Sequence, residues 1–216
     1  MKQLSEKIRA QKSSVKIGIS PFGIWKNSKT EGGAGTNGMS SYYDLYVDSK
    51  AFIDNQWIDY IVPQIYWSMS YSIADYDVLV NWWSQQVAGK NVHLYIGQAA
   101  YKINNGGGDA AWNNSQEIIN QIKYNRNTSN VKGNVFYSAS DILANRLGVY
   151  DALKNDLYKT PASTPEMPWK NTPMSTGVKI SSLTADKTSP QKLNSLITFN
   201  GSVSGAKKPL YRYSVH

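Results

Sequence analysis

The sequence predicts an α/β fold, about half of a (β/α)8 barrel with about four parallel strands and five helices, followed by a truncated β-sandwich segment. Two observations predict it. Four apolar, β-rich runs alternate with helical segments across residues 1–160, as in a parallel sheet covered by helices. After a proline-rich stretch the pattern changes to short alternating β runs. A doubly wound sheet is the alternative, but no glycine-rich nucleotide-binding turn follows any predicted strand.

Strands and helices are predicted in alternation along the first 160 residues. The strands are expected at 15–19, 60–66, 92–96 and 134–137. The helices are expected at 2–11, 42–55, 76–88, 116–125 and 142–158, with Ser115 as an N-cap. In the third helix Leu79, Val80, Trp83 and Val87 recur at helical spacing. A closed barrel of this kind has eight strands, so four strands predict half of one.

The rest of the chain divides into a linker and a small β segment. Residues 161–177 contain four prolines and predict an extended linker, with Trp169 docking it on the first domain. Residues 178–216 carry β runs at 178–183, 195–201 and 210–215, with a turn around 186–190. A complete sandwich has about seven strands. The tail is therefore predicted to be a partial Ig-like β domain.

Composition excludes several classes of protein and site. Apolar residues make up 41% and charged residues 18%, which predicts a folded globular chain. No apolar run is long enough to span a membrane, and the N-terminus carries no apolar stretch like that of a signal peptide. There are no cysteines and two histidines, so no metal and no cofactor is predicted, and acid–base chemistry falls to Asp and Glu.

The net charge of +8 does not predict a nucleic-acid partner. Residues 173–216 contain six basic residues and one acid, which leaves +3 for the first 172 residues. The lysines of the tail are scattered and form no basic patch of the kind that binds phosphates. The charge is mainly a property of the tail.

Aromatic, amide and hydroxyl side chains gather at the expected C-terminal ends of the four strands. In a barrel these ends meet on one face, so they predict a cleft lined by Trp25, Gln64, Tyr66, Trp67, Gln98, Tyr101 and Ser138. Aromatic faces stack on sugar rings and the polar groups bind hydroxyls, which suits a carbohydrate. The alternative for each ring is a place in the core, which is the interpretation of Trp57, Trp82 and Trp83. Lys102 either reaches the cleft or lies in solvent.

These strand ends supply no carboxylate, although glycoside hydrolysis usually needs two. The remaining catalytic candidates are Asp141, Glu31 and Asp109. Asp141 follows Ser138 by three residues, and capping of the last helix is the favoured interpretation. Asp59 begins the second strand and is expected at the opposite, stability-determining face.

Several motifs resemble the glycosyl-hydrolase-like family ten. They are VKIGISPFGIWKN (15–27), SYYDLYVDSKAFIDNQWIDYIVPQIYW (41–67), ADYDVLVNWWSQQVAGKNVHLYIGQAAYKI (74–103) and the segments within 117–139. The resemblance implies a TIM-barrel glycosidase, of which this chain would be the C-terminal half, from the fourth to the eighth helix. The acidic motif of the family's fourth strand would precede Met1, so the main catalytic carboxylate is expected outside this chain. Positions carried over as substrate-contacting or site-shaping are Ser20, Pro21, Phe22, Trp25, Gln64, Tyr66, Trp67, Gln98 and Tyr101.

The run ISSLTADKTSPQKLNSLITFNGSVSG resembles bacterial Ig-like repeats. Together the resemblances imply a bacterial, secreted or surface-located glycoside hydrolase that acts on a polysaccharide or cell-wall glycan, binding a poly- or oligosaccharide. The alternative is a non-catalytic carbohydrate-binding or surface-adhesion module. The open barrel edges also predict self-association.

Overall fold

The computed structural model describes residues 1–170, 179–188, 190, 192 and 195–204. The chain divides into two compact units, Met1–Lys170 and Asn171–His216.

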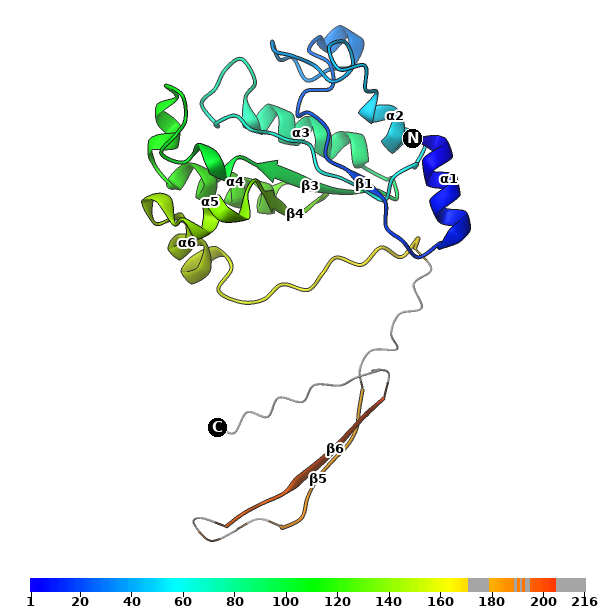
Figure 1. Cartoon of the computed structure of the whole chain (residues 1–216), viewed down its shortest axis with the longest axis vertical. Coiled ribbons are helices and arrows are strands. Elements are labelled where there is room, and N and C mark those ends of the chain that lie inside the picture. Colours follow the sequence, from blue (N-terminus) through cyan, green and yellow to red (C-terminus); the bar gives the residue numbers. More distant parts are fainter. Residues whose placement is uncertain (171–178, 189, 191, 193–194, 205–216) are drawn as a thin grey trace. The chain divides into compact units, whose positions relative to one another are not determined.

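The first unit is built on a four-stranded parallel sheet, as predicted (Figure 1). Its strands are β1 (Gly18–Ile19), β2 (Tyr60–Ile61), β3 (His93–Gln98) and β4 (Val131–Phe136), in the order β1-β2-β3-β4. This arrangement fits part of a TIM barrel. β2 ends earlier than predicted because Pro63 follows it and has no N–H for the ladder. β1 begins later than predicted, at Gly18, because the Ile17 N–H before it donates to the Asp59 side chain and not to a neighbouring strand. Single bridges from Gln64 to Phe22 and Gly97 continue the sheet beyond them.

Six α-helices connect and cover the strands in the first unit. They are α1 (Lys2–Gln11), α2 (Ser49–Asp54), α3 (Tyr76–Val87), α4 (Gln116–Asn127), α5 (Ala139–Leu143) and α6 (Val149–Ala152). Short turns of 3-10 helix are η1 (Lys29–Glu31), η2 (Ala100–Lys102), η3 (Ala110–Asn113) and η4 (Arg146–Gly148), and η5 (Leu153–Leu157) is a π-helical turn. None of the described helices is long and apolar enough to cross a membrane.

Two predicted helices are wrong in extent. The helix predicted at 42–55 is only α2, because Tyr46 has a positive φ of 55° and the Asp48 side chain caps the helix by accepting the Ala51 N–H. The helix predicted at 142–158 is broken into α5, η4, α6 and η5. Asn145, Leu147 and Gly148 all have positive φ there, which interrupts the helix.

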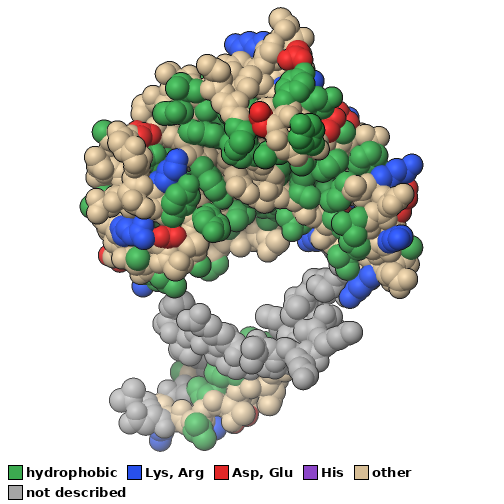
Figure 2. Space-filling view, turned by 45° about the horizontal axis from the view of Figure 1, so that its top comes forward, with side chains coloured by type: hydrophobic (Ala, Val, Ile, Leu, Met, Phe, Trp, Pro, Cys, Tyr) green, Lys and Arg blue, Asp and Glu red, His purple; other side chains and the backbone are tan. Residues whose placement is uncertain are grey.

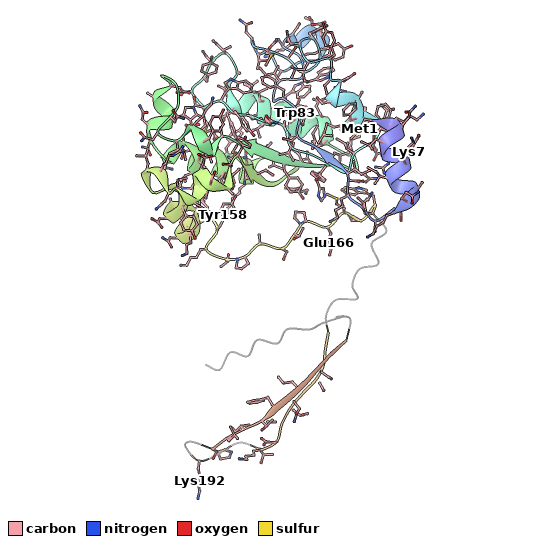
Figure 3. The ribbon with its side chains drawn as sticks, viewed as in Figure 1. Met1, Lys7, Trp83, Tyr158, Glu166 and Lys192 are labelled. Atoms are coloured by element: carbon pink, nitrogen blue, oxygen red, sulfur yellow. The ribbon has the colours of Figure 1, made fainter. Side chains whose placement is uncertain are left out.

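The main core lies between the sheet and α3. Leu94 and Ile96 of β3 are fully buried with Leu79 and Trp83 of α3. The Trp83 indole N–H donates to the Gly23 carbonyl at 2.8 Å, which ties α3 to the segment after β1 (Figure 3). The prediction that Trp82 and Trp83 are core residues is confirmed, with 8% and 0% of their surface exposed.

The opposite face of the sheet carries a row of glycines and tyrosines. The Tyr60 and Tyr95 rings meet edge to face at 6.1 Å. A Cβ at Gly18 would lie 2.2 Å from the Tyr60 ring, and one at Gly133 would lie 3.2 Å from the Tyr95 ring. Because side chains alternate along a strand, Tyr95 lies opposite the face of Leu94 and Ile96. The two glycines make room for the two rings.

At the N-terminal ends of the strands, buried Asp59 binds the segment that follows η5. Its carboxylate accepts the Ile17 N–H at 2.8 Å and pairs with Lys170 at 2.9 Å and Arg9 at 3.4 Å. The Trp169 indole donates to it at 3.3 Å and packs on His93 at 4.9 Å. The chain from Tyr158 past Glu166 reaches this end of the sheet near α1 (Figures 1 and 3). The predicted docking of Trp169 and the structural role of Asp59 are confirmed.

The second unit contains an antiparallel pair of strands, β5 (Lys179–Ala185) and β6 (Phe199–Ser204). Asp186 closes the end of the ladder by accepting the Thr198 N–H at 2.8 Å. The β run predicted at 210–215 lies outside the described residues. Assignment of this unit to an Ig-like domain stays a prediction.

Candidate functional site

Three tyrosines form a cluster at the C-terminal ends of β2, β3 and β4. Tyr66 meets Tyr101 edge to face at 5.9 Å and stacks on Tyr137 at 6.3 Å, and Tyr101 meets Tyr137 at 6.0 Å. Tyr137 is 61% exposed, whereas Tyr66 and Tyr101 are half-buried. The cluster therefore offers one open ring supported by two packed ones.

Burial raises the pKa of Tyr66 and of Tyr101 above the usual value, and the neighbouring phenols add to the effect. Both hydroxyls therefore stay protonated at neutral pH. Such phenols can donate hydrogen bonds to sugar oxygens as well as accept them.

Trp67 lies next to the cluster and is held from several sides. Its ring meets Phe22 edge to face at 5.6 Å. On α4, Gln121 donates to the Trp67 carbonyl at 3.1 Å, and Glu117 accepts the Met69 N–H at 2.9 Å. Gln121 also donates to Glu117 at 2.8 Å, so the two side chains act as one support. The position of Trp67 is set before any ligand arrives.

Ser20 and Gln64 meet at the ends of β1 and β2. The Gln64 amide donates to the Ser20 carbonyl at 3.0 Å, and the Ser20 hydroxyl donates to the Val62 carbonyl at 2.9 Å. The Ser20 side chain is exposed and Gln64 is partly exposed. Both remain open to a ligand at this edge.

Hydrophobic side chains, green in Figure 2, cover much of the face of the first unit in that view. Charged side chains lie mostly toward its margins. Uncharged polar groups and backbone separate the apolar areas.

Ser138 and Asp141 form a capping box at the start of α5. The Ser138 hydroxyl donates to Asp141 at 2.6 Å, its N–H donates to the same oxygen at 3.2 Å, and Arg146 pairs with the other oxygen at 2.8 Å. These hydrogen bonds and the ion pair lower the pKa of Asp141, and the hydrogen bond from the Ser138 hydroxyl has the largest effect. The favoured interpretation of Asp141 as a helix cap is confirmed, and an ionised cap is a poor general acid.

The other two carboxylate candidates lie in loops. Glu31 is exposed and accepts a hydrogen bond from the Tyr43 hydroxyl. Asp109 caps η3 by accepting the Ala111 N–H at 3.1 Å. Both carboxylates therefore already accept hydrogen bonds from groups of the protein. Among the described residues, no group of three or more His, Asp or Glu side chains is arranged to hold a metal ion.

Gln98 differs from its predicted place in the cleft. It is fully buried and donates to the Tyr76 hydroxyl at 3.2 Å, on the side of the helices. The physical reason is the two-residue repeat of a strand, which places Gln98 on the same face as Leu94 and Ile96. In this arrangement Gln98 does not face the strand-end cleft.

Trp25 also differs from its predicted place. Only 8% of its surface is exposed, and it stacks on Trp82 of α3 at 5.6 Å. Its indole N–H donates to Asp48 at 2.9 Å, next to α2. The Trp25 ring packs between α3 and the segment before α2. Neither face of the ring is therefore open for a sugar to stack on.

Tyr137 is the residue that sequence reasoning missed. It directly precedes Ser138 at the end of β4, and the same rule that selected Tyr66 would have selected it. The structure brings together Tyr66, Tyr101 and Tyr137, Phe22 with Trp67, and Ser20 with Gln64. It leaves Trp25 and Gln98 in the packed layers.

A family model described as glycosyl hydrolase-like 10 matches residues 1–114, more than half of the chain. The chain belongs to this glycosyl hydrolase-like family. It is 46% identical over 189 residues to the glycosyl hydrolase YngK of Bacillus subtilis, and 40% identical over 102 residues to the glycosyl hydrolase DigH of Escherichia coli. These matches confirm the resemblance seen in the motifs.

The chain spans only part of these glycosyl hydrolase-like relatives. The matches cover 87% of this chain and 37% of YngK, and 47% of this chain and 23% of DigH. The strand-end residues from Ser20 to Tyr101 all lie within the part that the family model matches. Tyr137 and Ser138 lie beyond it.

Proposed function

We propose that this chain forms the sugar-holding part of a glycoside hydrolase that acts on a polysaccharide or cell-wall glycan outside the cell or at its surface. The observation that carries the proposal is the cluster of Tyr66, Tyr101 and Tyr137 beside Trp67, at the strand ends of a chain from a glycosyl hydrolase-like family. A sugar ring would stack on Tyr137. Because β2 and β1 lie two and three strands away from β4, the Gln64 and Ser20 groups would bind hydroxyls of other units of the same oligosaccharide.

The same proposal assigns the bond-breaking carboxylates to residues outside this chain. Asp141 is a helix cap, Asp109 caps η3, and Glu31 lies in an exposed loop. Retaining and inverting enzymes both need two carboxyl groups that face each other across the bond. Hydrolysis of a glycan by the chain alone, abolished by Asp141→Asn, Asp109→Asn or Glu31→Gln, would contradict this part.

The test of the sugar-holding role is the affinity of the chain for a panel of oligosaccharides, measured by calorimetry. Tyr137→Ala is expected to weaken binding about tenfold, equivalent to about 1.4 kcal/mol. The matched control is Tyr46→Ala, since Tyr46 is 90% exposed but lies in the loop before α2. Equal affinities of the wild type and Tyr137→Ala, with unchanged melting, would overturn the proposed stacking.

A second candidate is a non-catalytic carbohydrate-binding or surface-adhesion module. It is favoured by the structural roles that the nearby carboxylates already have, as described for Asp141 and Asp109. Both candidates predict that Tyr137→Ala weakens binding. They differ in whether a longer protein that contains this chain releases sugar from a glycan, so a reducing-end assay separates them.

A further inference from the structure

A pocket of about 580 Å³ lies beside Trp67, outside the tyrosine cluster. Trp67 and Tyr71 form one wall, and η2 supplies Lys102 to the same pocket. The loop Gly106–Gly108, Asp109 and Ala110 complete the lining. Of these residues, the sequence offered Trp67 as a site residue and Asp109 as a catalytic candidate, and it left open whether Lys102 reaches the cleft.

Lys102 is the cation of this pocket, and its position is fixed. Its ammonium donates to the Tyr66 carbonyl at 2.6 Å and lies 5.6 Å from the centre of the Trp112 ring. An ammonium has three N–H donors, so one bond to Tyr66 leaves donors for a ligand. Among the described residues, no carboxylate lies within ion-pair distance of Lys102. Burial lowers the pKa of Lys102, while nearby Asp109 opposes this and favours the charged form.

The remaining lining gives a sugar ring room and an aromatic wall. At Gly107 and Gly108 a Cβ would meet nothing within 4 Å, and both have positive φ, of 61° and 97°. Their loop therefore borders open space. Trp67 is held by Phe22 and by Gln121, as described above. Asp109 presents a carboxylate that can accept a hydrogen bond from a sugar hydroxyl.

We infer that this pocket binds a sugar unit that carries a carboxylate, with the ring against Trp67 and the carboxylate on the Lys102 ammonium. The inference rests on the proposed function and names its substrate class, an acidic oligosaccharide. A partly buried ammonium suits this role because charge-assisted hydrogen bonds are stronger than neutral ones. Asp109 restricts the anion to the side of the pocket near Lys102, since two carboxylates repel each other.

The test compares acidic sugars with matched neutral ones, using the full 216-residue chain. Calorimetry would measure the Kd for trigalacturonic acid and its methyl ester, and for a hyaluronan hexasaccharide and its carboxyl-reduced form. We expect the wild type to bind at least one acid about tenfold more tightly than its neutral partner. This preference should shrink at 0.5 M salt because the ion pair is partly exposed.

Variants at position 102 test whether the lysine causes the preference. Lys102→Gln should remove it, Lys102→Arg should keep most of it, and the exposed control Lys123→Gln should leave it unchanged. Far-UV circular dichroism and melting would establish that each variant folds. Equal binding of acids and neutral forms by the wild type would overturn the inference while leaving the proposed function intact. Binding of neither form, together with no binding of any neutral oligosaccharide, would overturn both.

Discussion

At the scale of single residues, Asp141 and Gln98 show how local rules decide between chemistry and structure. Asp141 follows Ser138 by three residues, which is the spacing of a capping box, and the structure has that box. The role of Asp141 was therefore predictable from the sequence. The burial of Gln98 was equally predictable, because Gln98 lies two and four positions after buried Ile96 and Leu94 and therefore on the same face of the strand. The prediction that Gln98 lines the cleft was wrong because it considered only that Gln98 lies at the end of a strand. It did not consider that successive side chains of a strand point to opposite faces of the sheet.

The capping carboxylate gives a pH-dependent prediction for Asp141→Asn. The pKa of Asp141 is lowered from the usual 3.8, so the charged form stabilises the fold above that pH, and the contribution is lost as pH falls through the folded-state pKa. The melting temperature of the variant should lie below that of the wild type at pH 7. The gap should narrow below about pH 4. Thermal melts at pH 2.5–7 measure it, and a gap that stays constant to pH 2.5 would contradict the assignment.

At the scale of elements, the segment after β2 depends on close backbone contacts. Gly23 lies where a Cβ would be 2.4 Å from the Gln64 carbonyl oxygen and 2.9 Å from the Trp67 ring. The ends of β1 and β2 therefore approach closely only because residue 23 is glycine. The order of strands and helices was predictable from periodicity. The breaks at Tyr46, Asn145 and Leu147 were not, since positive φ at non-glycine residues depends on tertiary contacts.

Gly23→Ala is expected to destabilise the fold by about 1–3 kcal/mol, because the atom it meets is backbone and cannot rotate away. It should also shift the near-UV circular dichroism of Trp67. Urea denaturation measures the first effect. The matched control is Gly38→Ala, whose Cβ would meet only the end of the Ile24 side chain at 3.1 Å. Equal losses of stability in both variants would contradict the claim that the close contact of residue 23 with the Gln64 carbonyl requires glycine.

At the scale of the whole molecule, the first unit is closed at its N-terminal strand ends by residues 161–170. Lys170 and Trp169 both reach buried Asp59, 111 and 110 positions away along the chain. The sequence predicted an extended linker here, and it predicted the Trp169 contact. It did not predict the ion pair with Lys170, because a charged partner of buried Asp59 cannot be located without the fold.

Truncation separates the contribution of this segment from that of the second unit. A chain that ends at Lys170 should melt at the temperature of the first unit in the full chain. A chain that ends at Thr160 lacks Lys170 and Trp169 and leaves Asp59 poorly compensated, which is expected to cost about 3–5 kcal/mol. For a unit of this size, the melting temperature should fall by at least about 6 °C. Differential scanning calorimetry measures both, and similar melting of the two truncations would contradict the role of the segment.

The row of glycines and tyrosines on the sheet face opposite Leu94 and Ile96 limits how this sequence can change over generations. The side chains of residues 18 and 60 compete for the same space, since a Cβ at Gly18 would overlap the Tyr60 ring. A larger residue at position 18 requires the Tyr60 ring to turn away or position 60 to become smaller. Relatives with alanine or serine at position 18 are therefore expected to carry a non-aromatic residue at position 60 more often than relatives with glycine at position 18.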